Sequence, residues 1–357
     1  MSLKVGIVGL PNVGKSTLFK AITKKQVDCA NYPFCTIEPN VGVVAVPDAR
    51  LDALAKVSNS EKVIPAAIEF VDIAGLVAGA HKGEGLGNKF LSHIREVDAI
   101  VEVVRAFENK DIVHVSGKID PLADIETINL ELAYADLAAV EKRLETLRKQ
   151  ARAGVDRDAK ILLVGLEKVN AALAAGKQAR DVELTDDERV AIAAAQLLTM
   201  KPLLYVVNVD EDQLKSGFAL ADLPKDRQIP LCIRLEEELA SLPSAEVKDY
   251  LEALGLSLTG LDQLIKASYD LLGLMTFLTS GPKESRAWTV RKGAKAPEAA
   301  GVIHSDFEKT FIRAEVIDWK DFVELGEAGA REKGKLRIEG KDYVMREGDV
   351  CHFRVGA

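Results

Sequence analysis

The sequence predicts an α/β fold in which a parallel sheet carries helices on both faces, with a helical insertion and a smaller C-terminal domain. Three patterns predict it. Short β-branched runs alternate with helical segments, heptad spacing replaces this alternation mid-chain, and short alternating runs follow near residue 281. We therefore expect one domain over 1–123 and 201–280, an antiparallel helical hairpin over 124–200, and a mixed α+β domain over 281–357.

The composition of the chain is that of a globular protein with more than one domain. It has 357 residues, of which 48% are hydrophobic and 29% charged. No run approaches about 18 consecutive apolar residues, so we expect no membrane span. The start of the chain, Met1–Lys4, lacks the layout of a signal peptide, and four scattered cysteines form no CxxC pair. We expect a cytoplasmic monomer that does not bind membranes.

The strands and helices of the main domain follow one another along the chain. The first apolar run, Leu3–Val8, is typical of a buried strand, and a helix is expected over Ser16–Thr23. Further strands are expected at 41–46, 68–71, 99–104, 203–207 and 229–233, and helices at 48–57, 86–97 and 261–272.

The middle of the chain has the spacing of a helical hairpin. Apolar residues recur at alternating steps of three and four over 130–151, and again over 159–173, with Gly154 and Asp156 between the two runs. Thr185 and Glu188 form a capping-box pattern that opens a third helix. The length of the heptad run favours a projecting hairpin over the alternative, in which these helices pack on the sheet.

The C-terminal region is predicted to be a small α+β domain. Alternating runs predict strands at 286–290, 312–317, 335–338, 343–345 and 350–355, and a helix at 319–325.

A phosphate-binding loop lies between the first strand and the first helix. Residues 9–16 read GLPNVGKS and match GxxxxGK[ST] in full. Gly9 and Gly14 let the backbone wrap around anionic oxygens, so amide groups and the helix N-terminus point at phosphates. We expect Lys15 to reach the β- and γ-phosphates of a nucleoside triphosphate and the Ser16 hydroxyl to bind Mg²⁺.

Two switch-like segments follow the phosphate loop. Thr36 lies in a loop before a strand, where a threonine would sense Mg²⁺ and the γ-phosphate; the alternative is an ordinary turn threonine. Asp72 and Gly75 form a DxxG pattern at a strand end. Asp72 would hold the Mg²⁺ shell, and the Gly75 amide would contact the γ-phosphate.

The base site departs from the pattern that binds guanine. Asn208 begins an NVDE segment where NKxD would stand, and Glu211 replaces the aspartate. Guanine requires a carboxylate across its N1–H and amine, whereas an asparagine amide pairs with an adenine edge. We therefore expect ATP to bind more tightly than GTP. Cys232 begins a loop in the position that would support the base.

The catalytic group is not obvious from the sequence. Leu76 stands where Ras-like enzymes carry the glutamine that orients the attacking water. Two histidines, His81 and His114, are candidates for this role, each with the alternative of a surface or capping histidine. Asn12 is a candidate for holding K⁺ in place of an arginine finger. These features predict slow intrinsic turnover that a partner raises.

The net charge of −8 argues against nucleic acid, but it is unevenly distributed. Residues 281–357 carry 15 Lys and Arg against 14 Asp and Glu, a net +1, so the acidity belongs to 1–280. Basic residues gather in the C-terminal domain and near the hairpin tip: Arg331, Lys333, Lys335, Arg337 and Lys341, with Lys142, Arg143, Arg148, Lys149, Arg152 and Arg157. We interpret these two clusters as one composite RNA-facing groove; the alternative is a solvated charged face.

These motifs together resemble the YchF/Obg-like ATPase family over nearly the whole chain. The segments that carry the resemblance are 6–19, 31–44, 72–88, 120–132, 208–211 and 305–317. The resemblance implies a Ras-like, Obg-type P-loop NTPase domain, an inserted helical hairpin and a C-terminal TGS domain with a ubiquitin-like β-grasp fold.

The resemblance also implies site residues and partners. The set that would bind ATP is Asn12, Val13, Gly14, Lys15, Ser16 and Thr17, with the Val209 backbone at adenine; Ser16 and Thr36 would ligate Mg²⁺, and His114 would position water. The family associates with ribosomes, so we expect the large subunit or the 70S particle as partner, and a role in regulating translation or the stress response. Two alternatives stay open: an Obg-type GTPase in ribosome assembly, and a non-hydrolysing adaptor that senses nucleotides.

Overall fold

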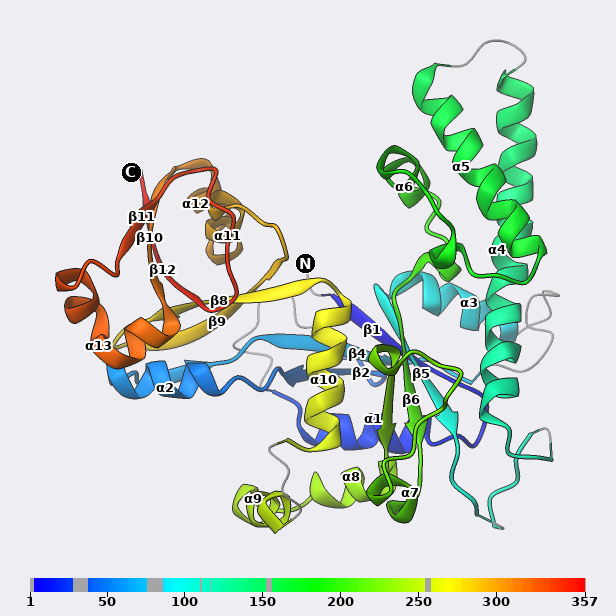
Figure 1. The fold of residues 1–357 in the computed structure, drawn as a ribbon, viewed down its shortest axis with the longest axis horizontal. Coiled ribbons are helices and arrows are strands. Elements are labelled where there is room, and N and C mark those ends of the chain that lie inside the picture. Colours follow the sequence, from blue (N-terminus) through cyan, green and yellow to red (C-terminus); the bar gives the residue numbers. More distant parts are fainter. Residues whose placement is uncertain are drawn as a thin grey trace.

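The computed structural model describes residues 3–27, 38–75, 86–109, 111–115, 117–151, 156–253 and 258–356, which form two six-stranded sheets and a projecting helical hairpin (Figure 1). The first sheet has the order β2-β4-β1-β5-β6-β7. Its strands are β1 (Lys4–Val8), β2 (Val41–Ala45), β4 (Ala67–Asp72), β5 (Ala99–Arg105), β6 (Leu203–Asn208) and β7 (Gln228–Leu231). All neighbouring strands are parallel except the edge strand β2, which is antiparallel to β4. The expectation of a wholly parallel sheet is therefore wrong at this edge.

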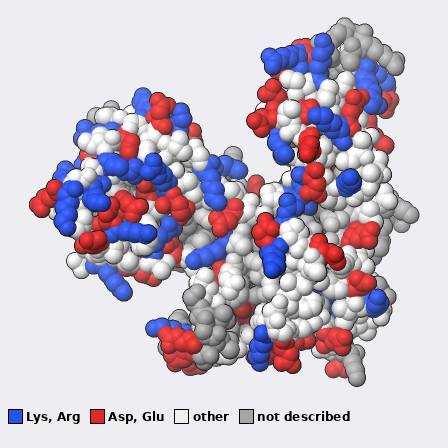
Figure 2. Space-filling view, in the orientation of Figure 1, with Lys and Arg blue, Asp and Glu red and all other residues white. Residues whose placement is uncertain are grey.

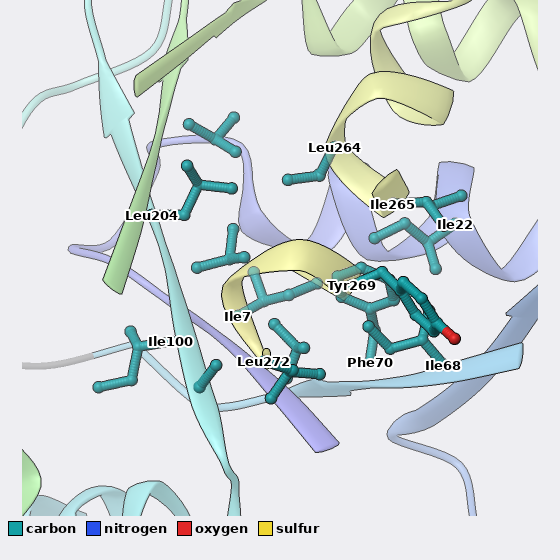
Figure 3. Packing of buried hydrophobic residues seen from close by; sticks show 14 of the residues in the cluster. Ile7, Ile22, Ile68, Phe70, Ile100, Leu204, Leu264, Ile265, Tyr269 and Leu272 are labelled. Atoms are coloured by element: carbon teal, nitrogen blue, oxygen red, sulfur yellow. The ribbon is translucent and has the colours of Figure 1, made fainter. Parts of the chain in front are cut away.

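Helices pack on this sheet as the alternation predicts. Those nearest the sheet are α1 (Lys15–Lys24), α3 (Leu86–Glu96) and α10 (Gly260–Leu271). Figure 3 shows Ile22 of α1 and Leu264, Ile265 and Tyr269 of α10 packed against Ile7, Phe70 and Leu204 of the strands. The other helices of this domain are α2 (Ala49–Ser58), α7 (Glu211–Lys215), α8 (Ile233–Leu239), α9 (Ser244–Ala253) and the 3₁₀ turn η5 (Lys225–Arg227). The predicted strand end at Ile233 is wrong, because β7 stops at Leu231 and Ile233 opens α8.

The hairpin consists of α4 (Pro121–Ala151) and α5 (Arg157–Ala174), and it projects from the sheet (Figure 1). Its own core contains Val140 and Leu144 of α4 with Leu166 and Val169 of α5. The chain returns through η3 (Ala179–Asp181), α6 (Asp186–Ala193) and η4 (Leu198–Met200). The capping box predicted at Thr185 is confirmed, because both of its hydrogen bonds are present.

Helix α4 belongs to two cores at once. Ile125, Ile128 and Leu132, near its start, lie in the core of the first sheet, whereas Val140 and Leu144 lie in the core of the hairpin. One continuous helix therefore joins the sheet to the hairpin tip.

The second sheet has the order β11-β10-β12-β8-β9-β3. Its strands are β3 (Lys62–Ile64), β8 (Leu274–Ser280), β9 (Glu284–Arg291), β10 (Phe311–Asp318), β11 (Arg337–Glu339) and β12 (Asp349–Val355), with helices α11 (Ala296–Ile303), α12 (Ser305–Lys309) and α13 (Trp319–Glu332). The C-terminal strands of this sheet therefore start at Leu274 rather than after residue 281, since β8 pairs with β9. The strand predicted at 343–345 is absent from this described region, where Val344 makes one isolated bridge to Lys295.

The two sheets are joined by strand pairing and by side chains. Strand β3, which follows α2, pairs in parallel with β9 of the second sheet. At this junction the Ser60 hydroxyl lies 2.8 Å from that of Ser285, and Arg50 forms an ion pair of 2.6 Å with Glu347. The C-terminal domain is thus attached through a shared sheet edge. Within the described ranges, every helix is too short or too polar to cross a bilayer.

A buried carboxyl group lies on β5 beneath the hairpin base. Glu102 is fully buried, and neither of its carboxylate oxygens has a hydrogen-bond partner among the described residues. Burial raises the pKa of Glu102 well above its ordinary value, and the charge of Arg180 offsets only part of this effect.

We predict that Glu102→Gln flattens the dependence of stability on pH. Because the folded-state pKa is raised, the stabilisation from protonated Glu102 is complete below the unfolded-state pKa and is lost as pH rises. The free energy of unfolding of the native chain should therefore fall above about pH 4.5, by at most ~1.4 kcal/mol per pH unit. Urea titrations between pH 5 and 8 measure this, with the exposed Glu252→Gln as control. The prediction would be contradicted if the free energy of unfolding changed with pH equally in the native chain, in Glu102→Gln and in Glu252→Gln.

Candidate functional site

The candidate site lies where the strands of the first sheet end. The register places Asp72 of β4 beside β1, Arg105 of β5 opposite Asn208 of β6, and Asn208 opposite Leu231 of β7. Carboxyl ends of parallel strands meet at one edge, where open α/β sheets bind ligands. The predicted phosphate loop, DxxG segment and base motif are therefore brought to one edge.

The phosphate loop has the backbone that its glycines predict. Gly14 has φ of 105°, and a Cβ there would lie 2.6 Å from the Asn208 side-chain nitrogen. Gly9 has φ of 152°, and a Cβ there would lie 2.5 Å from the Val103 carbonyl oxygen. Side chains at either position would push the loop off the sheet. Helix α1 starts directly afterwards at Lys15, so its N-terminal amides face the loop.

Lys15 and Asp72 form the charged centre of the site. Lys15 is buried, its Nζ donates to the Leu10 carbonyl at 2.6 Å, and burial lowers its pKa to about 8, although the charge of Asp72 opposes the shift. A Cβ on Gly75 would lie 3.0 Å from the Lys15 Nζ, so the DxxG loop lies against the lysine. Phosphate oxygens would favour the charged lysine and complete its hydrogen bonds.

The donor set near Asp72 fits Mg²⁺. Asp72 Oδ1 is buried without a hydrogen-bond partner among the described residues, and burial raises the pKa of this carboxyl group while the Lys15 charge lowers it. Ser16 is exposed in the first turn of α1. Hydroxyl and carboxylate oxygens are ligands that Mg²⁺ prefers. Thr36, the third predicted ligand, lies outside the described residues.

Asn208 holds the phosphate loop to the rest of the edge. Its side-chain nitrogen donates to the Val13 carbonyl at 2.9 Å, and its Oδ1 accepts from the Ile233 amide at 3.2 Å. The side chain is buried. Both ends of the amide thus contact backbone, which differs from the expectation that this amide pairs with adenine.

A cavity of about 560 Å³ opens beside Asn208. Among its lining residues are Asn12, Gly14, Thr17, Phe107, Ile112, Asn208, Val209, Glu211, Cys232 and Arg234. Glu211 Oε1 accepts a hydrogen bond of 3.1 Å from Arg234 across the lining. Cys232 is buried, and burial raises the pKa of its thiol, so it is an inert wall rather than a reactive thiol.

One wall of the cavity depends on Arg105, which sequence analysis missed. This arginine is fully buried at the end of β5, and its guanidinium donates to the carbonyls of Phe107, Asn109 and Ile112 at 3.3, 3.1 and 3.0 Å. It also lies 4.5 Å from the Phe107 ring centroid. A charged residue ending a strand whose other residues, apart from Glu102, are apolar was the available signal.

His114 lies on the next part of this loop and faces α4. Its Nε2 is 2.9 Å from Oδ2 of Asp124 in the first turn of α4, and both side chains are buried. Its neighbour Val113 accepts a hydrogen bond of 3.1 Å from Asn12 of the phosphate loop. In this conformation the predicted water-positioning histidine is held by the hairpin helix. Leu76 and His81 lie outside the described residues.

Comparison with known proteins identifies the family. A family model described as "50S ribosome-binding GTPase" matches residues 4–136, and a model for the YchF C-terminal region, described as a protein of unknown function, matches residues 274–356. The curated protein "Ribosome-binding ATPase YchF" of Haemophilus ducreyi is 56% identical over 99% of each chain, and that of Bacillus subtilis is 54% identical over the same share. The chain belongs to the YchF family.

A solved YchF structure shares this fold. The structure described as the Schizosaccharomyces pombe YchF GTPase aligns with a TM-score of 0.88 at 41% identity, covering 99% of this chain and 98% of that one. The predicted family and α/β fold class are thus confirmed. The printed names of YchF relatives differ in one respect, since the bacterial proteins are called ATPases and the yeast protein a GTPase. The choice of base therefore has to come from the site itself.

We predict that Asn208→Ala weakens ATP and GTP binding by similar factors. The substitution leaves the Val13 carbonyl and the Ile233 amide without their partner, which costs about 1–3 kcal/mol, or roughly 5- to 150-fold in affinity. Calorimetric titration of both nucleotides measures the effect, with Asn109→Ala, also in the cavity lining, as control. A loss confined to ATP would mean that the amide contacts the base.

Proposed function

We propose that this chain is a slow ATPase whose nucleotide state controls its association with the ribosome, and so regulates translation or the stress response. The observation that carries the proposal is the ion pair between Glu211 and Arg234 in the lining of a cavity next to the phosphate loop. Asn208, in the same lining, already has both ends of its amide hydrogen-bonded to the backbone. The printed names of its relatives, which include ribosome binding and ATPase activity, support the same function.

The base preference follows from the groups around the cavity. Guanine recognition needs a carboxylate that accepts from both N1–H and the amine, and one oxygen of the Glu211 carboxylate already accepts from Arg234. The Val209 amide donates to the Leu231 carbonyl at 3.0 Å, which leaves the Val209 carbonyl as its acceptor group. A carbonyl accepts from an exocyclic amine, and adenine carries one at C6 where guanine carries an oxygen.

The phosphates and metal would occupy the charged centre. Lys15 would contact the β- and γ-phosphates, the Val13, Gly14 and Thr17 segment would wrap them with backbone amides, and Ser16, Asp72 and Thr36 would hold Mg²⁺. Bound Mg²⁺ neutralises charge on the transferred phosphoryl group. The Gly75 amide would contact the γ-phosphate. A K⁺ ion beside Asn12 would be bound by Oδ1 of Asn12, since Nδ2 of that side chain donates to the Val113 carbonyl. Equal rates of ATP turnover in K⁺ and in Na⁺ would exclude a role for this ion.

Two features support slow intrinsic turnover. Leu76 stands where Ras-like enzymes carry glutamine, and a leucine cannot orient water. The side chain of His114, the other candidate, is hydrogen-bonded to Asp124 of α4. A partner that moves α4 would separate His114 from Asp124, which ties turnover to the hairpin.

The deciding experiment for the function combines turnover with ribosome binding. Single-turnover ATP hydrolysis is measured with and without 70S ribosomes, and pelleting is compared in ATP, ADP and nucleotide-free states. We expect ribosomes to accelerate hydrolysis and the three states to pellet differently. Equal pelleting in all three states would exclude a nucleotide switch, and absent hydrolysis would favour the adaptor function.

We predict that ATP binds about tenfold or more tightly than GTP, a difference of ~1.4 kcal/mol. Arg234→Ala with Glu211→Asp should narrow this gap, because it restores an unpaired carboxylate of the length that guanine requires. Arg234→Ala alone is the matched control. Isothermal titration that shows tighter GTP binding to the native chain would favour the GTPase alternative.

We predict that Asp124→Ala raises ATP turnover by about threefold, ~0.65 kcal/mol in the barrier, because it releases His114 from α4. Single-turnover rates measure the effect. The double variant Asp124→Ala with His114→Ala is the control, and it should lose the gain. A gain that survives in the double variant would show that another group acts on the water.

A further inference from the structure

One face of the second sheet gathers arginines from three elements. Arg313 and Glu315 of β10 and Arg354 of β12 share this face, since Arg313 pairs with Arg354 and Glu315 with His352 in the antiparallel register. Ile338 of β11 is opposite Glu315 on its other side. Arg331 reaches the same place from α13. We call the set Arg313, Glu315, Arg331, Ile338, His352 and Arg354 the arginine face.

A single buried carboxylate organises the arginine face. The Glu315 side chain is 7% exposed and accepts two hydrogen bonds of 3.1 Å from Arg354, with Arg313 at 3.3 Å and Arg331 at 3.6 Å. Hydrogen bonding to Arg354 and Arg313, together with nearby positive charge, holds the pKa of Glu315 below its ordinary value despite the cost of burial. The carboxylate therefore stays ionised and fixes the three guanidinium groups before any ligand arrives.

The three guanidinium groups offer more donors than Glu315 can accept. Their side chains are 48% (Arg313), 57% (Arg331) and 44% (Arg354) exposed, and each carries five N–H donors. Among the ion pairs of the described residues, Arg331 also contacts Glu327, at 3.5 Å. Figure 2 shows Lys and Arg side chains gathered around acidic ones on the C-terminal domain. Donors on this face thus remain directed toward solvent.

Apolar and aromatic surface lies beside these donors. Ile338 is 65% exposed and His352 is exposed on the same face. A hollow of about 670 Å³ borders it, lined by Glu315 and His352 with Ile317, Phe322 and Leu336 among the apolar residues. Phosphodiester oxygens suit arginine forks, and unstacked bases suit histidine, guanidinium planes and apolar hollows.

We propose that the arginine face binds single-stranded RNA, with the backbone phosphates on Arg313, Arg331 and Arg354 and a base against His352 at the hollow. This rests on the proposed association with ribosomes and assigns it a contact. It also replaces part of the predicted RNA groove: Arg337 is engaged by Asp349 at 3.1 Å, Glu339 at 3.2 Å and the Tyr343 hydroxyl at 3.0 Å. Arg337 is thereby a structural residue rather than an RNA contact.

The test measures RNA binding by the full chain as a function of salt. Fluorescence anisotropy uses a labelled 12-nucleotide single-stranded RNA and the double variant Arg313→Gln with Arg354→Gln. Removing two phosphate contacts should weaken binding about tenfold or more at low salt and reduce the slope of log K against log salt by about 1.4. Lys225→Gln with Lys248→Gln, an equal charge change on the first domain, should leave the slope unchanged.

Further variants separate RNA contact from loss of folding. Glu315→Gln keeps all three arginines and one acceptor oxygen for Arg354, so it should retain RNA binding. Arg313→Lys with Arg354→Lys keeps the charge and should bind with intermediate affinity. ATP turnover in the absence of ribosomes should stay at its native value in the double Gln variant, which shows that the chain is folded, whereas its melting temperature should fall because Glu315 loses its two closest partners. A double Gln variant with unchanged RNA affinity and slope overturns the proposal.

Two outcomes distinguish RNA binding from binding of an acidic protein, and from the proposed ribosome association. Lost ribosome pelleting with unchanged RNA affinity would mean that the arginines bind an acidic protein, and would overturn the RNA assignment. A native chain that binds the RNA through these arginines but never pellets with ribosomes would refute the proposed function while leaving the RNA site intact.

Discussion

The buried amide of Asn208 is the contact on which the arrangement of the nucleotide site depends. It lies at the end of β6, holds the phosphate loop through the Val13 carbonyl and holds the start of α8 through the Ile233 amide. Gly14 permits this approach, because a Cβ there would collide with the amide nitrogen. An asparagine in the base motif thus has a structural role whichever base is bound. The preference between adenine and guanine is then determined by Glu211, Arg234 and backbone groups of the cavity.

The site is connected to the two parts of the chain most distant from it. Toward the hairpin, Asn12 contacts Val113, and His114 contacts Asp124 at the start of α4, which continues to the hairpin tip. Toward the C-terminal domain, α2 and β3 attach to the second sheet through β9. The first connection runs through two side-chain contacts at a loop and the second through sheet pairing, so the hairpin connection is the easier one to break and remake.

The sequence predicted most elements of the first domain because each of them buries apolar residues that recur with the helix or strand period along its own segment. It placed α2, β5, β6, α4 and α5 close to their observed bounds for this reason. It missed β8 as part of the second sheet and misjudged residues 343–345, because partner strands are set by long-range register rather than by local pattern. The phosphate-loop residues were identifiable because their spacing encodes a local backbone shape. The roles of Arg105 and Asp124 were not, since each depends on which loop folds over it.

Net charge was a poor guide to the surface for the same reason. The net charge counts Glu315 and Arg354 equally, but the glutamate is buried and the arginines around it are about half exposed. Burying one carboxylate beneath three guanidinium groups restrains the arginines and directs their unused donors outward, at little cost to the total charge. An acidic chain can therefore present an organised cationic face, because the surface potential depends on which charges are buried as well as on how many there are.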